Sequence, residues 1–201
     1  MANLDNPRGF KVCRHLTGGT PARMNAYKIL NGLDEAIYKG AAVNSDGSGG
    51  IKEAAANEVI LGVFAGVQWV DAEGEVQFRQ WWKSTDNSLV DVTDMVALVY
   101  DDPMLTFAGQ CSGSKVAAAL GLVSDISVPS PSGDSATGES RMEVGADDGS
   151  ETQLKVLRFI YETQRNSTGG YQLSAEGTNA MVEFKVVRHE LGAFAAIVEV
   201  A

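Results

Sequence analysis

The stretch VILGVFAGVQWVDAEGEVQFRQWW, residues 59–82, decides the fold class. Its first half is apolar at nearly every position, as in a strand covered on both faces, and it holds two glycines at which such a strand can bend. Asp71 to Gly74 has the composition of a tight turn. The residues after it alternate, so we expect Val76 and Phe78 to face inward and their neighbours to face outward. The stretch predicts a long β-hairpin.

The rest of the chain repeats this pattern of short apolar runs between turn signals. We expect further strands at 26–30, 36–43, 95–100, 105–110, 154–161, 179–189 and 193–201, with 105–110 pairing with 95–100 and a short helix at 115–122. Eight or so short strands at hairpin spacing predict an all-β fold, either an antiparallel barrel or a jelly-roll-like sandwich. Within 179–189 the alternation places Val182, Phe184 and Val186 on one side of a strand, and Glu183 and Lys185 on the other.

Length and composition narrow the class of protein. The chain has 201 residues, a formal charge of −10 and 44% hydrophobic residues, which fits one soluble domain with its own core. No apolar run approaches the roughly 20 residues of a membrane helix, so we expect no membrane partner. The two cysteines make neither a disulfide framework nor a four-cysteine zinc site. We therefore expect no metal and no cofactor.

The charge is unevenly distributed along the chain. Residues 1–30 carry five basic side chains against Asp5 alone, for +4, while the remainder carries −14. This region also contains glycines and prolines without a helical period, so we interpret 1–25 as an extended basic arm. The domain would then be 26–201, with a long Ser/Gly/Pro loop at 127–150.

A basic arm on an acidic body suggests a partner with an acidic surface. The candidate contacts in the arm are Arg8, Phe10, Lys11, Arg14, His15 and Arg23. We do not expect direct binding of nucleic acid, because five cations without stacking aromatic residues are few and the acidic body repels phosphate. Exposed strand edges are usually paired, so we also expect contacts between copies of the chain, with a trimer favoured over a dimer.

One motif raises the alternative of an enzyme. Gly109 to Gly113 reads GQCSG, which matches a nucleophile elbow with Cys111 in place of serine, and His189 follows later in the chain. An elbow requires a parallel α/β sheet, whereas the flanking segments predict hairpins. His189 also begins an HELGA sequence, but the second histidine of a zinc motif is missing. We expect no enzyme and keep a cysteine hydrolase using Cys111 and His189 as an alternative.

Trp81 and Trp82 raise a second alternative. Adjacent residues of a strand face opposite sides, so one indole could pack in the core while the other is exposed. An exposed tryptophan suits a protein interface or stacking on a sugar ring. A carbohydrate-binding module is therefore a further alternative.

Several segments together resemble a known family. The opening ANLDNPRGF (2–10), RHLTGGTP (14–21), IYKG (37–40), LGVFAG (61–66), YDDP (100–103) and VRHEL (187–191) are similar to head decoration, or cement, proteins of tailed bacteriophages. The chain departs from the family's pattern at Ala41, where an acidic residue often follows the glycine. The resemblance implies a β-rich, non-enzymatic virion protein on the outer capsid surface, made in the bacterial cytoplasm. It would bind and bridge subunits of the major capsid protein.

Overall fold

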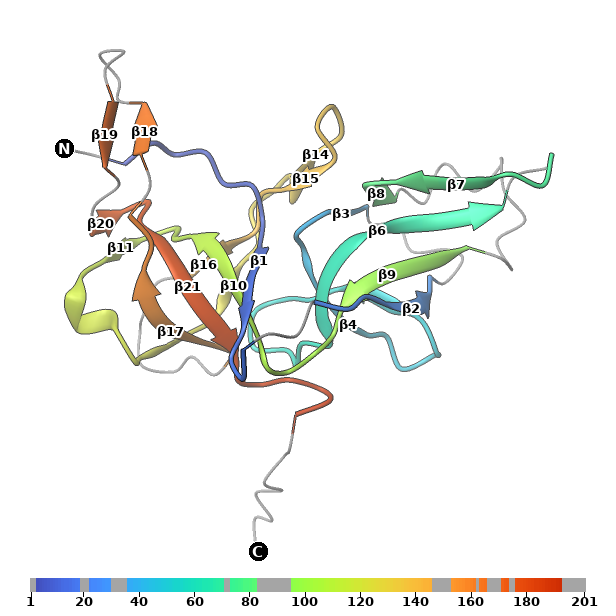
Figure 1. The fold of residues 1–201 in the computed structure, drawn as a ribbon, viewed down its shortest axis with the longest axis horizontal. Helices are drawn as coiled ribbons and strands as arrows, with labels where there is room; N and C mark the ends of the chain where they lie inside the picture. Colours follow the sequence, from blue (N-terminus) through green and yellow to red (C-terminus); the bar gives the residue numbers. More distant parts are fainter. Residues whose placement is uncertain are drawn as a thin grey trace, which may run out of the picture.

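A computed structural model describes residues 3–18, 22–29, 36–70, 73–82, 95–145, 153–161, 163–165, 171–173 and 176–192. The described chain is almost entirely β, and every pairing between named strands is antiparallel. The predicted all-β antiparallel class is confirmed. Two main sheets lie side by side (Figure 1), and among the described residues neither closes into a barrel.

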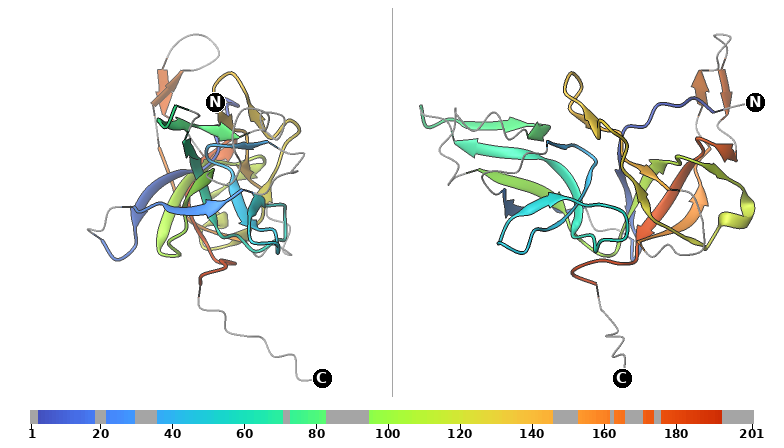
Figure 2. Two further views of the ribbon diagram at one scale, coloured as in Figure 1. Left: turned by 90° about the vertical axis from the view of Figure 1, so that its right-hand side faces the viewer. Right: turned by 180° about the vertical axis from the view of Figure 1, so that it is seen from behind.

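The five-stranded sheet runs in the order β1 (Lys11–His15), β10 (Leu105–Gln110), β21 (Met181–Val186), β17 (Leu154–Phe159) and β12 (Val123–Ser124). The six-stranded sheet runs β2 (Asn25–Lys28), β9 (Val96–Tyr100), β6 (Gly62–Val70), β4 (Ala42–Ser45) and β5 (Ile51–Glu53), with β7 (Val76–Arg79) also paired to β6. The predicted hairpin is therefore present, formed by β6 and β7. It extends outward at one end of the molecule (Figure 2).

Short two-stranded sheets accompany these two main sheets. They are β3 (Ile37–Tyr38) with β8 (Trp81–Trp82), β11 (Ser114–Lys115) with β20 (Gly177–Thr178), β13 (Ile126–Ser127) with β16 (Glu143–Val144), β14 (Gly133–Asp134) with β15 (Glu139–Ser140), and β18 (Thr163–Arg165) with β19 (Tyr171–Leu173). The predicted loop at 127–150 thus contains paired strands as far as it is described. The predicted helix at 115–122 is a single 3₁₀ turn, Ala117–Ala119, and the predicted strand at 193–201 lies outside the described residues.

One hydrophobic core spans both sheets. Phe64 and Val99 contribute from the six-stranded sheet, and Phe107 and Phe184 from the five-stranded sheet, each almost fully buried. Phe10 joins this core, with its ring 4.8 Å from that of Phe184 in an edge-to-face arrangement. A continuous core makes the two sheets parts of one packed unit.

The first residues of the chain are extended, as expected, but they are part of the body. β1 pairs with β10 as an edge strand, with a bulge at Cys13, and Phe10 is 3% exposed. The interpretation of 1–25 as an arm outside the core is therefore wrong for this part. Phe10 and Val12 are two positions apart, so both point to the core side of this extended segment. The basic residues and glycines of the sequence did not indicate such packing.

Two strand predictions also need correction. β10 does not pair with β9: after Tyr100 the chain turns at Asp101–Met104 and enters the other sheet, where β10 lies between β1 and β21. In β7 the orientation is opposite to the predicted one, because Val76 and Phe78 are 64% and 56% exposed. The second half of β6 is also open on one face, ending in an exposed Val70.

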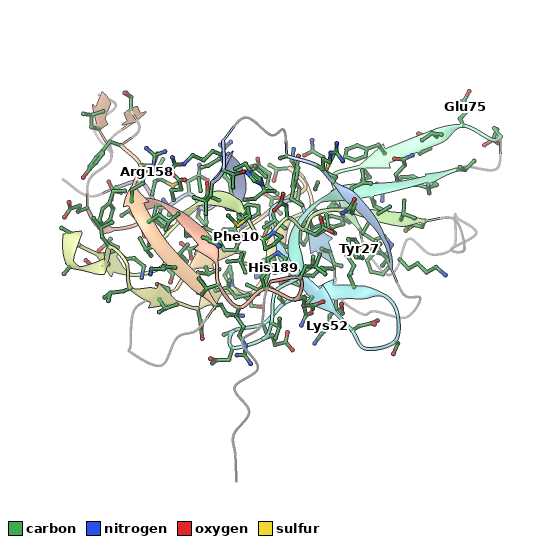
Figure 3. The ribbon with its side chains drawn as sticks, turned by 60° about the horizontal axis from the view of Figure 1, so that its bottom comes forward. Phe10, Tyr27, Lys52, Glu75, Arg158 and His189 are labelled. Carbon is green, nitrogen blue, oxygen red and sulfur yellow. The ribbon has the colours of Figure 1, made fainter. Side chains whose placement is uncertain are left out.

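Polar residues form hydrogen bonds at the junction, the region where the two sheets meet. The buried Asp101 accepts hydrogen bonds from the side-chain amide of Asn25, at 2.9 and 3.0 Å, and from the hydroxyl of Tyr27. His15 Nε2 lies 3.1 Å from Asp102 Oδ2. After β21 the chain returns to the six-stranded sheet, where His189 forms a bridge with Ile60. Figure 3 shows His189 near the middle of the molecule, between the two sheets.

Candidate functional site

The outer face of the five-stranded sheet carries a cluster of cations. Across the strands, Lys11 lies opposite Ala108, which lies opposite Glu183, which lies opposite Arg158. The next row on the same face runs Arg14, Thr106, Lys185, Lys155. We call this surface the cationic face, defined by Lys11, Arg14, Lys155, Arg158, Lys185 and the central Glu183. The opposite face of these strands forms the core, because side chains alternate along a strand.

Glu183 organises the middle of the cationic face. Its side chain has no exposed area, and its Oε1 accepts hydrogen bonds from Arg14 Nε and Thr106 Oγ1, both at 2.7 Å. Its Oε2 accepts a hydrogen bond from Arg158 Nε. Burial alone would raise the pKa of Glu183, but the hydrogen bonds from these three residues outweigh it and hold that pKa below its usual value. The carboxylate therefore stays charged and fixes both arginines.

The two arginines remain accessible to a partner. The Arg14 and Arg158 side chains are 56% and 58% exposed although each is bonded to Glu183. Each of these bonds uses Nε, so the rest of the planar guanidinium fork is oriented by the buried carboxylate. A guanidinium held in one orientation loses less side-chain entropy when it binds a carboxylate or phosphate.

The net charge of the cationic face is opposite in sign to that of the whole chain. Five cations and one carboxylate give the cationic face a formal charge of +4, whereas the whole chain carries −10. Lys155 and Lys185 lie directly opposite each other on neighbouring strands, an arrangement of like charges that costs stability. An anionic partner on this face would relieve that repulsion. The arrangement therefore favours binding of an acidic surface.

The cationic face continues toward the N-terminal segment. A hollow of about 370 Å³ is lined by Arg8, Lys11 and Gln110, among others, and one of about 390 Å³ by Arg8, Lys11 and Lys39. Arg8 Nε lies 3.8 Å from a carboxylate oxygen of Glu139. Lys11 and Arg14 thus share the cationic face, and Arg8 lines both hollows beside Lys11.

The other predicted contacts of the arm lie elsewhere. Phe10 is buried against Phe184 and cannot serve as an apolar anchor for a partner, because its ring is already part of the core. His15 is engaged with Asp102 at the junction. Arg23 is exposed and lies two positions before β2, at the edge of the six-stranded sheet.

The sequence reasoning missed half of the cationic face. Lys155, Arg158 and Lys185 come from β17 and β21, far along the chain from the basic N-terminal segment. The available signal was the alternation in 181–186, which places Glu183 and Lys185 together on one side. Only the pairing of β1 with β10, and of β10 with β21, brings Arg14 to Glu183 across 169 positions.

The two tryptophans are packed by their neighbours. Trp82 is 3% exposed, in agreement with one indole being in the core. Trp81 stacks on Tyr38, with ring centroids 5.9 Å apart, and the Arg79 guanidinium lies 5.2 Å from the Trp81 centroid. Because both residues pack within the protein, this pair gives no specific support to stacking on a sugar ring.

The candidate hydrolase residues are also buried. Cys111 has no exposed area, and its backbone is paired with Ala180 and Val144. His189 is 3% exposed, and its Nδ1 accepts a hydrogen bond from the backbone of Leu191 at 3.0 Å. A thiol enclosed in the core cannot reach a substrate carbonyl. The arrangement gives the hydrolase alternative no support.

Comparisons with protein-family models, with curated proteins and with solved structures found no match. Within the described part of the chain, no helix is long and apolar enough to cross a membrane. The same residues contain no group of three or more histidine, cysteine and acidic side chains placed to hold a metal ion. The cationic face is therefore the surface on which a functional interpretation rests.

Proposed function

We propose that this protein is a structural component of a phage virion that decorates the outer surface of the capsid. The cationic face is the observation that carries the proposal, because it concentrates +4 on one sheet of a chain of −10. It docks on an acidic surface of the major capsid protein. The resemblance of several segments to phage decoration proteins supplies the identity of that partner.

The charge arrangement suits docking on a large fixed surface. A cationic face on an otherwise acidic molecule gives the approaching protein a preferred orientation, since the rest of its surface is repelled by the same partner. Such steering raises the association rate, while desolvated contacts determine the dissociation rate. Decoration then stabilises the assembled head by mass action, because the protein binds the finished lattice and not its separate subunits.

Binding to heads tests the proposal. The protein is mixed with heads assembled without it, from the phage that encodes the chain, and association is followed at increasing salt. We expect the association rate to fall as salt rises, since the Debye length at physiological ionic strength is about 8 Å. Lys155→Glu, on the cationic face, should slow association several-fold more than Arg23→Glu, an equal charge change near β2.

Two outcomes overturn the proposal. Absence of the chain from purified virions, as judged by mass spectrometry, removes the assignment to the virion. Equal effects of Lys155→Glu and Arg23→Glu, with both variants folded by circular dichroism, remove the cationic face as the docking site.

A further inference from the structure

The outer face of the six-stranded sheet carries a strip of exposed apolar side chains. Val70, Val76 and Phe78 on the β6–β7 hairpin are 44%, 64% and 56% exposed. On the same face Phe78 lies opposite Gln68, which lies opposite the half-buried Val96 of β9. The strip therefore runs across neighbouring strands.

The strip reaches the far edge of this sheet. Leu98 of β9 lies on the same face as Val96 and opposite Ala26 of β2, which is exposed. Met24, two positions before Ala26, is 46% exposed. We call Met24, Ala26, Val70, Val76, Phe78, Val96 and Leu98 the apolar strip.

The opposite face of the same strands shows that this exposure is specific to one side. Val67 and Ala97, one position along from Gln68 and Val96, are 1% and 0% exposed. Phe78 does not fold back into the core either: its ring covers Gly66, where an added Cβ would lie 2.5 Å from a ring carbon. The ring thus lies over Gly66 on the outside of the sheet.

The strip is large enough to act as an association surface. Four strands about 4.8 Å apart and four rows of side chains about 6.8 Å apart give a patch of roughly 300 Å². That is comparable with the largest apolar patch on a typical monomer, and such patches are often interaction sites. A standard stable interface takes about 800 Å² from each partner, so this strip with its polar rim should give a weak complex.

Charges at the two ends of the strip identify the occupant. Lys28, in register with Val96, stands at the β2 end and is exposed. Glu73 and Glu75 stand at the tip of the hairpin, and Figure 3 shows Glu75 at the extreme end of the molecule. A second copy turned by a two-fold axis places its hairpin tip over the β2 end of the first. Apolar strips then meet in the middle, with Lys28 opposite the exposed turn residue Glu73 at both ends.

We infer that the protein self-associates through the apolar strip as a two-fold dimer, with sheets packed face to face. Two identical sheet faces pack with their strands within about 30° of each other and with interdigitating side chains. An isologous contact of this kind closes on itself, so it favours a dimer over the trimer expected from strand edges alone. The inference is independent of the cationic face, which lies on the other sheet.

Sedimentation of the purified chain tests the dimer without any head present. Between about 1 and 500 μM, the range in which a weak interface associates, the mass should rise from 21.3 kDa toward twice that value. Val76→Asp should raise the dissociation constant of the dimer at least tenfold and leave the circular dichroism spectrum unchanged. Leu173→Asp, a matched change at a residue 65% exposed on β19, should leave the dimer intact.

A charge exchange distinguishes a second copy from any other occupant. Lys28→Glu and Glu73→Lys should each weaken the dimer, and the chain carrying both should recover most of the wild-type affinity. A monomer at every concentration, a trimer, equal effects of Val76→Asp and Leu173→Asp, or failure of the double variant to recover would overturn the inference. So would a monomeric chain in which Val76→Asp abolishes head binding, since the strip would then belong to another partner. None of these results bears on the cationic face, which the Lys155→Glu experiment tests separately.

Discussion

Glu183 shows how a single buried charge can hold a surface in place. Its carboxylate is enclosed by Arg14, Arg158 and Thr106, and it joins strands that lie far apart in sequence. The alternation of β21 predicts which way its side chain points. It does not predict burial, because the residues that cover Glu183 come from β1 and β17.

Replacing Glu183 by glutamine should therefore cost stability. Glu183→Gln leaves two adjacent guanidinium groups without their shared carboxylate, and we expect a loss on the order of 3 kcal/mol in the free energy of unfolding at pH 7. The folded pKa of Glu183 lies below its unfolded value, so its contribution is present above about pH 4.5 and is lost as the pH falls through the folded pKa. Urea unfolding at pH 7 and pH 3 should show the gap between wild type and variant closing. An equal gap at both values, or an equal loss in Glu73→Gln, would contradict this.

Glu143 should change the pH dependence of stability in the opposite direction to Glu183. Burial, and secondarily the charge of Asp5, raise the pKa of Glu143 to about 7. The protonated form of Glu143 is favoured in the folded state. Its contribution to the free energy of unfolding is therefore present below about pH 4.5 and is lost as the pH rises through about 7. Glu143→Gln should stabilise the protein at pH 8 by about 1 kcal/mol, after allowance for partial exposure, and have little effect at pH 4. Melting temperatures at the two pH values check this, and Asp5→Asn should give a smaller shift of the same sign.

At the scale of elements, alternation identifies which residues share a face but not which face is buried. In β7 the prediction had Val76 and Phe78 inward, whereas Trp69 and Arg79 occupy the other face, with Arg79 5.8 Å from the Trp69 ring centroid. The predicted pairing of β10 with β9 was wrong for a related reason. A short polar turn after β9 is typical of a hairpin, but the same turn can carry the chain into another sheet when its aspartates bind groups at the junction.

β1 is the element whose role differs most from expectation, and Phe10 beside it provides a test. Phe10→Ala removes a ring packed against Phe184 and should cost about 3–5 kcal/mol in the free energy of unfolding, whereas Leu16→Ala, at a residue 39% exposed, should cost under about 1 kcal/mol. Deleting residues 2–15 removes the edge strand altogether and should prevent folding. A truncated chain that retains a cooperative urea transition would show that β1 is dispensable and restore the interpretation of an independent arm.

At the scale of the whole molecule, the two sheets are held together by their shared core and by the polar junction. The class of fold follows from short apolar runs and turns, which are local signals. The junction does not, because it assembles Asn25, Tyr27, Asp101 and His189 from segments that are remote in sequence. The cationic face and the apolar strip lie on different sheets for the same reason: each depends on strand order, which local pattern does not encode.

The junction should loosen when His189 becomes protonated. Burial lowers the pKa of His189, against the opposing charges of Asp101, Glu190 and Asp102, while Lys185 lowers it further. The neutral ring is therefore favoured in the fold, and its contribution is present above about pH 6.5 and is lost as the pH falls through the folded pKa. Because Glu143 titrates in the same window with the opposite sign, the experiment uses the Glu143→Gln background.

In that background the free energy of unfolding should fall with decreasing pH, by at most about 1.4 kcal/mol per unit from this one group. Amide protection factors, which allow for the slower intrinsic exchange at lower pH, should fall first at the bridge between Ile60 and His189, since those backbone bonds join the C-terminal segment to the six-stranded sheet. His189→Gln should remove most of the pH dependence between pH 6.5 and pH 5, whereas His15→Gln should leave the protection at Ile60 unchanged. If the protection instead responds to His15→Gln alone, the contact of His15 with Asp102 controls the junction and His189 is only a packed core residue.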